Sequence, residues 1–240
     1  MNTALTLTRA AISIDRPAGD DRRATLPYLL HQAVADLFGD QADRGYLFRV
    51  LRQQPGRQVV LVLSRHAPEP LERLPRRHHW RALSIESKPF QPALEPGQEL
   101  DFEIWLNATR CRRDEQQRQR RVDIWDAVWM ADHDTLLTQH KVYHAYLAER
   151  LQGAAEVLEA RLTERGEVRP RRAKGTAMPF IAANIAGRLR VTDPPALVDV
   201  MGSGIGRAKA FGCGLLCLSR PGTILARRPQ SHGERALASQ

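Results

Sequence analysis

Cysteine and lysine are both scarce in this chain of 240 residues. The three cysteines, Cys111, Cys213 and Cys217, are too few for a disulfide framework and form no C-x-x-C pair, which argues against a zinc site. No apolar run approaches the roughly 18 residues of a membrane-spanning helix. The N-terminus also lacks the basic segment and apolar run of a signal peptide. These absences predict a cytoplasmic protein without a membrane partner.

Only four of the 36 basic residues are lysine, so arginine carries nearly all of the positive charge. The planar guanidinium binds phosphate oxygens with two donors, and a net charge of +9 attracts polyanions at long range. A GC-rich genome would explain the ratio of arginine to lysine, but it would not explain the excess of base. The composition therefore favours a nucleic-acid partner.

The first half of the chain alternates between strand and helix patterns. Period-2 alternation predicts strands at 3–14, 45–52, 57–64, 80–90 and 99–112. A helix is expected over 26–40, with Thr25 as its cap and Pro27 in its first turn, and a short helix over 68–77. The first hundred or so residues thus have the order β-α-β-β-α-β, which is typical of a ferredoxin-like domain.

The second half repeats much the same order. A helix is predicted over 134–155, strands over 156–164, 180–193 and 213–222, and a short helix over 194–202. We therefore expect an α+β protein of two tandem ferredoxin-like (RRM-like) domains. Their predicted limits are 1–110 and 135–220, with a basic, mobile loop at 111–134 and a disordered tail at 221–240.

The segment MGSGIGRAKAFGCGLL, Met201–Leu216, carries five glycines, Arg207 and Lys209. A dinucleotide loop or P-loop needs a strand before the glycines and a helix after them. Here the order is reversed and no G-K-[S/T] follows, which argues against a nucleotide-dependent enzyme. Two alternatives remain: a structural turn, or a loop that approaches a sugar-phosphate chain and pairs its cations with phosphates.

The stretch ALVDVMGSGIGRAKAFGCGLLCLSR resembles the glycine-rich loop and following strand of the CasE family. These proteins are the CRISPR RNA-processing endoribonucleases of type I-E systems. The similarity extends from about residue 4 to residue 220 and is also strong at YLLHQAVADLF. It implies two ferredoxin-like domains and RNA cleavage without metal or other cofactor. It also implies, as partners, a repeat stem-loop RNA and the other subunits of a Cascade complex.

The resemblance places His31 on the family's catalytic histidine and Tyr28 on the tyrosine that some members carry three residues earlier. His31 would act as general acid or base, because imidazole titrates near neutral pH, while Tyr28 orients the sugar or phosphate. Some members supply a lysine a turn beyond the histidine; this chain has Asp36 and then no basic residue before Arg44. Without the resemblance, a lone histidine is more often a boundary residue of its helix.

The same resemblance assigns RNA binding to two segments. In the first, the glycine loop, the candidates are Gly202, Gly204, Gly206, Arg207 and Lys209. The second is a basic hairpin that would follow the phosphates of an A-form stem, and its candidates are Arg165, Arg169, Arg171, Arg172 and Lys174. The plain alternative for the second segment is a solvated cluster of charge.

Two functions remain open on the sequence. The first is a metal-independent endoribonuclease that binds a CRISPR repeat stem-loop, cleaves it by 2′-hydroxyl attack and keeps the product. The second is a non-catalytic RNA-binding subunit. His140 and His144 have metal-ligand spacing on a helix, but no third ligand is near them in the sequence, so no metal site is expected.

Overall fold

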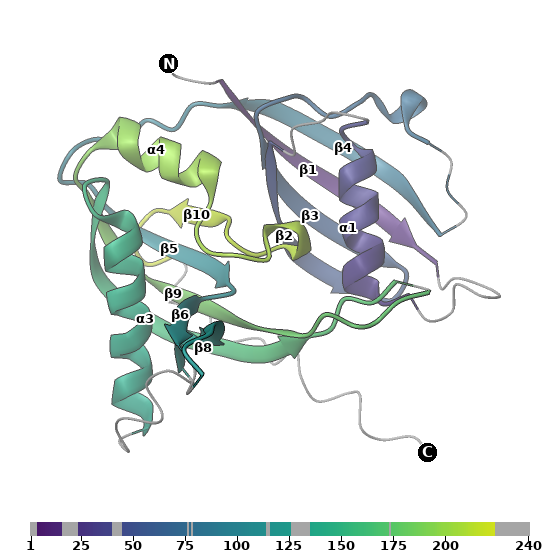
Figure 1. Cartoon of the computed structure of the whole chain (residues 1–240). Helices are drawn as coiled ribbons and strands as arrows, with labels where there is room; N and C mark the ends of the chain where they lie inside the picture. The colour runs from purple at the N-terminus through teal and green to yellow at the C-terminus, as the bar shows by residue number, and fades with distance from the viewer. Residues whose placement is uncertain are drawn as a thin grey trace.

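A computed structural model describes residues 4–15, 24–39, 45–75, 77, 79–113, 116–125, 135–172 and 174–223. Its elements form two antiparallel four-stranded sheets and one two-stranded hairpin (Figure 1). In chain order they are β1 Leu5–Ile14, α1 Leu26–Asp36, β2 Tyr46–Gln54, β3 Arg57–Ser64, η2 Leu71–Arg73, β4 Trp80–Phe90, β5 Glu99–Leu106, β6 Thr109–Arg113, β7 Gln119–Asp123, α3 Thr135–Leu151, β8 Ala155–Val168, β9 Phe180–Val191, α4 Pro194–Ser203, η3 Lys209–Phe211 and β10 Leu216–Ser219.

The first sheet has the strand order β2-β3-β1-β4, with α1 against one face. The buried stripe of α1 (Leu29, Leu30, Ala33, Val34) packs on alternate residues of the strands, which explains the period-2 pattern in the sequence. A bulge between Ala11 and Ile12 shifts the pairing of β1 with β4.

The second sheet has the order β10-β5-β9-β8 and is packed with α3 and α4. Asp193 caps α4 by accepting a hydrogen bond from the backbone N–H of Ala196 at 3.0 Å, and two prolines occupy the first turn. Both sheets thus have the strand order of a ferredoxin-like unit, since in chain order each reads 4-1-3-2. The predicted fold class is confirmed.

One strand from within the predicted first domain belongs to the second sheet. Glu99–Leu106 falls inside the predicted limits 1–110, but it pairs with β9 and β10 in the second sheet. The chain therefore passes between the sheets within residues 91–98, and the helix expected over 68–77 is only a 3-10 turn at 71–73. Alternation shows that a segment is a strand; its partners are chosen by non-local packing. The domain limits 1–110 and 135–220 stay a prediction.

Residues 111–134 were predicted as a mobile loop after a strand over 99–112. Part of this loop is ordered, because β6 and β7 pair in register, with Cys111 opposite Arg121 and Arg112 opposite Arg120. We call this hairpin the arm. Its base is tied to the body by a buried Ile124, whose N–H donates to the carbonyl of Ala108 at 3.1 Å. Most of the predicted tail, 224–240, and part of the predicted loop, 126–134, lie outside the described residues.

The two sheets pack against each other through the face of the first sheet that α1 leaves open. Leu5, Leu47 and Leu63 of the first sheet belong to the same hydrophobic core as the second sheet and its helices. Beside this core, the guanidinium of Arg49 forms a largely buried ion pair with Glu103. The relative position of α1 and the second sheet is therefore held by packing and by charge.

Candidate functional site

Tyr28 and His31 lie on one face of α1, with ring centroids 6.3 Å apart. Both are half-buried at the border of the apolar stripe, as their spacing of three residues predicts. Thr25 has the extended backbone of an N-cap, but its side chain makes no capping hydrogen bond. The predicted cap is wrong in this respect, and the hydroxyl group has another use.

Thr25 ties the basic segment 165–174 to the start of α1. Its Oγ1 accepts from the backbone N–H of Arg171 at 3.0 Å and donates to the carbonyl of Arg169 at 3.1 Å. Its own N–H donates to the carbonyl of Arg171 at 3.1 Å. Figure 1 shows the long β8–β9 hairpin reaching from the second sheet to the N-terminal end of α1. In consequence the guanidinium carbon of Arg172 stands 5.7 Å from the centre of the Tyr28 ring.

The glycine-rich loop reaches the same helix from another direction. Phe211, at the end of η3, places its ring centroid 5.4 Å from that of His31. Phe180, the first residue of β9, lies on the other side of Phe211 at 5.8 Å. The structure thus brings together α1, the glycine loop and the end of the basic hairpin, which are far apart in the sequence.

Contacts within the protein explain why the loop contains glycine. Gly204 and Gly214 have φ of +73° and +90°, and an added Cβ would stand 2.7 Å from Leu47 Cδ1 and 2.7 Å from the carbonyl oxygen of Ile205. A Cβ on Gly206 would meet the carbonyl of Asn107 at 3.1 Å, and one on Gly202 would meet Leu5 at 3.2 Å. The glycines therefore allow the loop to fit between the two sheets, and their contact with RNA stays a prediction.

The two cations of the loop differ in their surroundings. The ammonium group of Lys209 donates to the carbonyl of Ser203 at 2.6 Å, at the C-terminal end of α4. This bond holds the loop against the helix and partly neutralises the carbonyl charge there. The side chain of Arg207 is exposed, while its backbone N–H is anchored on the carbonyl of Asn107 at 3.3 Å. Arg207 is the better placed of the two to meet a phosphate.

The five cations predicted in the basic hairpin also fall into distinct groups. Arg165 pairs with Asp123 at the base of the arm at 3.3 Å, and Arg169 pairs with Glu167 at 2.6 Å. Arg171 is half-buried, whereas Arg172 and Lys174 are exposed. Arg172 is therefore an exposed cation placed beside Tyr28.

Asp36, which takes the position near the family's lysine, forms an ion pair with Arg77. The guanidinium Nε and one terminal nitrogen of Arg77 donate to its two carboxylate oxygens at 2.9 and 3.3 Å. The carboxylate charge is thus compensated at the end of α1 rather than left beside His31. The cation beside Tyr28 comes from the basic hairpin instead of from α1.

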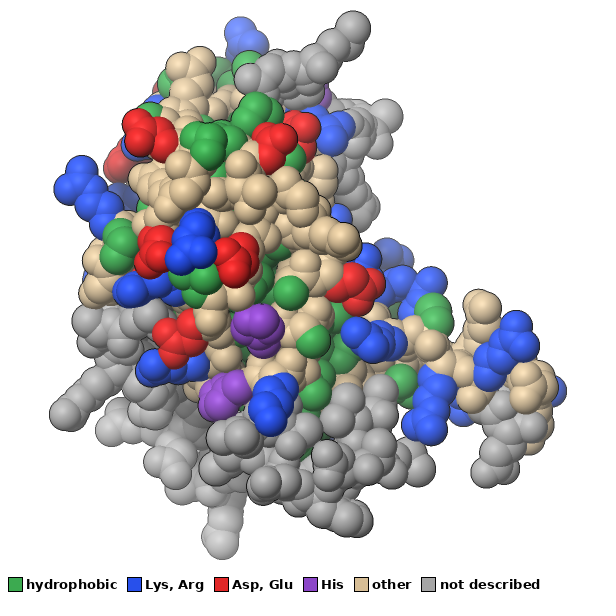
Figure 2. All heavy atoms as spheres, turned by 90° about the vertical axis from the view of Figure 1, so that its left-hand side faces the viewer, with side chains coloured by type: hydrophobic (Ala, Val, Ile, Leu, Met, Phe, Trp, Pro, Cys, Tyr) green, Lys and Arg blue, Asp and Glu red, His purple; other side chains and the backbone are tan. Residues whose placement is uncertain are grey.

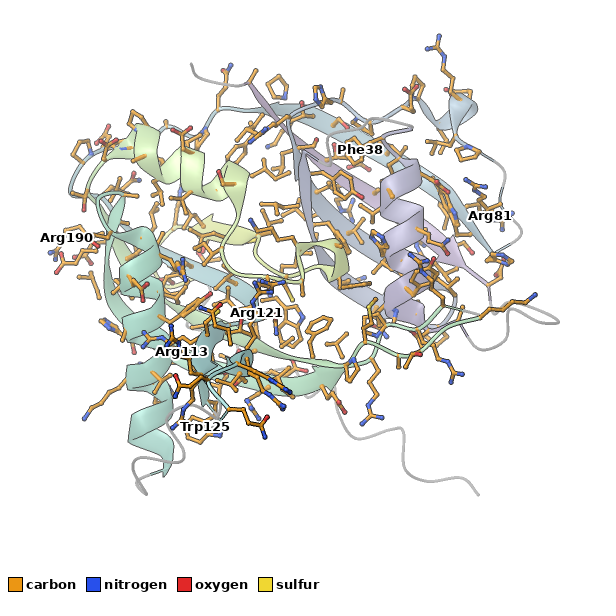
Figure 3. The ribbon with its side chains drawn as sticks, viewed as in Figure 1. Phe38, Arg81, Arg113, Arg121, Trp125 and Arg190 are labelled. Atoms are coloured by element: carbon orange, nitrogen blue, oxygen red, sulfur yellow. The ribbon has the colours of Figure 1, made fainter. Side chains whose placement is uncertain are left out.

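The arm is a basic feature that the sequence placed in a disordered loop. In the space-filling view it projects from the body and carries basic side chains, all of them arginine, whereas the face beside it mixes acidic and basic groups (Figure 2). Figure 3 shows Arg113 and Arg121 on the arm and Arg190 near the end of the internal strand β9. Arg190 is paired with Glu99 and Glu156, each at 2.9 Å.

His140 and His144 take part in hydrogen bonds within the fold, and Cys213 is buried. Nδ1 of His140 accepts from the N–H of Leu162 at 3.2 Å, and Nε2 of His144 lies 2.9 Å from the carbonyl oxygen of Val157. Burial raises the pKa of the Cys213 thiol to about 12.

In the described part of the chain, no three His, Cys, Asp or Glu side chains are grouped so that they could hold a metal ion. None of the helices described there is long and apolar enough to cross a membrane.

Comparison with known proteins gives consistent matches over most of the chain. A family model described as "CRISPR associated protein" matches residues 5–220. The CRISPR system Cascade subunit CasE of Escherichia coli K12 is 29% identical over 196 residues, which cover 80% of this chain and 91% of that protein. The CRISPR-associated endoribonuclease Cse3 of Thermus thermophilus is 26% identical over 218 residues, 80% of this chain and 90% of that one. A solved structure of the CRISPR endoribonuclease Cse3 bound to a 19-nucleotide RNA has the same fold, with a TM-score of 0.64, 24% identity, and coverage of 90% of this chain and 99% of that one.

Proposed function

This chain belongs to the family of CRISPR-associated proteins, and from that premise we propose that it is a CRISPR RNA endoribonuclease. It binds the repeat stem-loop of the precursor RNA and cleaves on its 3′ side, without a metal ion. Its relatives of similar length are named as a Cascade subunit and as an endoribonuclease, which supports this reading. The net charge of +9 fits a polyanionic substrate.

One observation carries the proposal: three separate segments meet around Tyr28 and His31. The ring of His31 is near Tyr28 on its own helix and Phe211 of the glycine loop, and Arg172 stands over the ring of Tyr28. A titratable group is thus combined with a phenol and an exposed cation at the end of a basic hairpin. These are the parts that cleavage of a phosphodiester by proton transfer requires.

The chemistry needs no external nucleophile, because RNA supplies its own. The 2′-hydroxyl oxygen attacks the adjacent phosphorus, so a P–O2′ bond forms while the P–O5′ bond breaks. The hydroxyl gives up its proton and the departing 5′-oxygen gains one, and His31 serves one of these transfers. The products are a 2′,3′-cyclic phosphate, which water can open to a 3′-phosphate, and a 5′-hydroxyl.

Negative charge accumulates on the non-bridging oxygens during the attack, and a fixed cation lowers its energy. Arg172 has the position for this role, since its segment is held on α1 by Thr25 and its guanidinium lies beside Tyr28. Tyr28 donates a hydrogen bond to the sugar or phosphate. Lys209 acts indirectly by fixing the loop on α4, and Arg207 offers a second, exposed cation.

The basic hairpin binds the stem. Arg169, Arg171 and Lys174 lie on the segment that joins the second sheet to α1, so they can follow the phosphates of a helix whose end lies at His31. Contacts with the backbone suit double-stranded RNA, because its deep groove is too narrow for side chains to read bases. Strong binding of the stem after cleavage makes the protein a single-turnover enzyme, consistent with a subunit that retains its product.

Cleavage of a hairpin RNA in EDTA tests the proposal, with wild type, His31→Ala and His66→Ala side by side. His66 is an exposed histidine outside the site, so His66→Ala is the matched control. We expect wild type and the control to cleave, and His31→Ala to bind the RNA without cleaving it.

Three results would contradict the proposal in different ways. Binding without cleavage by wild type would favour a non-catalytic RNA-binding subunit. A strict requirement for magnesium would overturn the metal-free chemistry, and a requirement for ATP would favour a nucleotide-dependent enzyme. Full activity of His31→Ala would remove the imidazole from the mechanism.

A further inference from the structure

Four aromatic rings from three elements follow one another beside the basic hairpin. Tyr28 and His31 of α1 are 6.3 Å apart, His31 and Phe211 of η3 are 5.4 Å apart, and Phe211 and Phe180 of β9 are 5.8 Å apart. All four are half-buried, so each keeps part of its surface in contact with solvent. The proposed chemistry uses the first two rings and leaves Phe211 and Phe180 without a role.

The surroundings of Phe180 combine apolar surface with positive charge. Met178, two residues before it, is 58% exposed, the largest exposure among the large exposed hydrophobic residues of the described chain. Its N–H donates to the carbonyl of Pro170 at 3.0 Å, so it is fixed beside the arginine-bearing segment that follows β8 and includes Arg172. Exposed apolar side chains next to cations are typical of surfaces that bind single-stranded nucleic acid, where bases stack on rings and phosphates meet arginines.

We propose that Phe180 and Phe211 form a stacking site for one unpaired nucleobase of the RNA, the base on the 3′ side of the bond that is cut. The inference rests on the proposed function, because it places the scissile phosphodiester at His31. Phe180 pairs with Val168 at the start of the basic segment, so its ring lies next to the cations that bind the stem. In the proposed function the cut is on the 3′ side of the stem, so the nucleotide after the cut is the first one outside the stem.

The occupant is an unpaired base rather than a base of the stem. Bases within a duplex are covered on both faces by their neighbours, so only a nucleotide outside the stem can offer a free face to a ring. Stacking accepts every base, because each has an aromatic face. The site therefore fixes the position of the flanking nucleotide and hence the position of the cut, with little preference for sequence.

A binding experiment with a hairpin RNA that ends in one 3′ nucleotide tests this site. A 2′-deoxy substitution before the scissile bond blocks cleavage, and the final nucleotide carries either adenine or no base. Wild type should bind the RNA with adenine about tenfold more tightly than the abasic RNA. Phe180→Leu, which keeps an apolar side chain but removes the ring, should bind both RNAs equally.

Two further variants separate stacking from folding. Phe90→Leu changes another partly buried phenylalanine, on the edge strand of the first sheet, and should keep the tenfold difference. Phe180→Tyr restores a ring and should restore the difference even if Phe180→Leu is less stable. The inference is overturned if wild type does not distinguish the two RNAs, or if Phe180→Leu still does. Failure of the proposed function would look different, since wild type would then not cleave the unmodified hairpin.

Discussion

The tether between α1 and the basic hairpin can be cut by a single substitution, Thr25→Val. Valine keeps the shape of threonine but removes the hydroxyl that joins Arg171 N–H at 3.0 Å and the Arg169 carbonyl at 3.1 Å. Two partly exposed hydrogen bonds contribute about 1–2 kcal/mol together. The bond from the Thr25 N–H to the carbonyl of Arg171 remains, so the segment is loosened rather than released.

The expected result is a slower chemical step with the stem still bound. At saturating RNA, the single-turnover rate should fall by up to about thirtyfold, the factor that corresponds to 2 kcal/mol. The affinity for the stem-loop should change little, because the arginines of the hairpin are still present. Rapid-quench cleavage and equilibrium filter binding on the same RNA measure the two quantities.

Thr163→Val is the matched control. The hydroxyl of Thr163 also makes two hydrogen bonds, to the carbonyl and the amide of Asn184 at 3.0 and 2.9 Å, but it joins β8 to β9 within the sheet. It should cost similar stability in thermal unfolding and leave the cleavage rate unchanged. The reasoning is refuted if Thr25→Val cleaves at the wild-type rate, or if both variants slow cleavage equally.

Three further predictions concern other parts of the chain. Arg172→Ala should lower the single-turnover cleavage rate at saturating RNA on the order of tenfold or more. Arg169→Ala, which removes the partner of Glu167, should only weaken RNA binding. Equal effects of the two variants on the cleavage rate and on the affinity would contradict the assigned roles. Gly214→Ala should lower the free energy of unfolding by roughly 1–3 kcal/mol in a urea titration, because φ is +90° and the added Cβ meets a carbonyl oxygen. Gly166→Ala is the control and should leave that free energy unchanged, because no atom lies within 4 Å of its added Cβ. Burial raises the pKa of the Cys213 thiol from 9.0 to about 12, so between these pH values the folded state keeps a proton that the unfolded chain releases. The free energy of unfolding should therefore fall as pH rises from 9.0 to about 12, by at most about 1.4 kcal/mol per pH unit. Urea titrations should show a flatter decline for Cys213→Ala, and an unchanged slope would refute this prediction.

Local patterns in the sequence located most helices and strands. The apolar stripe of α1 and the alternation of β3 and β9 repeat with the period of their element, so each can be recognised within a single segment. The fold class followed from their order. The limits of α4 were also close, because Asp193 and two prolines mark its start chemically.

Features that depend on contacts between distant segments were not predictable in this way. The alternation in Glu99–Leu106 identifies a strand but not its sheet, which is set by packing against β9 and β10. The arginines of the arm suggested a solvated loop, yet Asp123 pairs with Arg165 and Ile124 is buried at its base. A few residues outside a charged segment decide whether it is ordered.

The parts of the candidate site that come from distant segments were also not predictable from local patterns in the sequence. The sequence and the family resemblance identified His31, but nothing near it in the chain indicates Phe211 or Phe180, because neither lies within a hundred residues of it. The glycines of the loop were predicted to approach RNA or to form a structural turn, and their φ angles and neighbours show that they let the loop pass between two sheets. Their contact with RNA stays a prediction.

The chemical nature of the cleaved ends tests the central claim most directly, that His31 acts on a phosphodiester whose own 2′-hydroxyl is the nucleophile. Mass spectrometry of a hairpin RNA cleaved by wild type in EDTA should find a 2′,3′-cyclic phosphate, or the 3′-phosphate one water heavier, on the upstream fragment. The downstream fragment should begin with a 5′-hydroxyl. A 5′-phosphate on that fragment, or cleavage of an RNA with 2′-deoxyribose at the cut, would contradict the account.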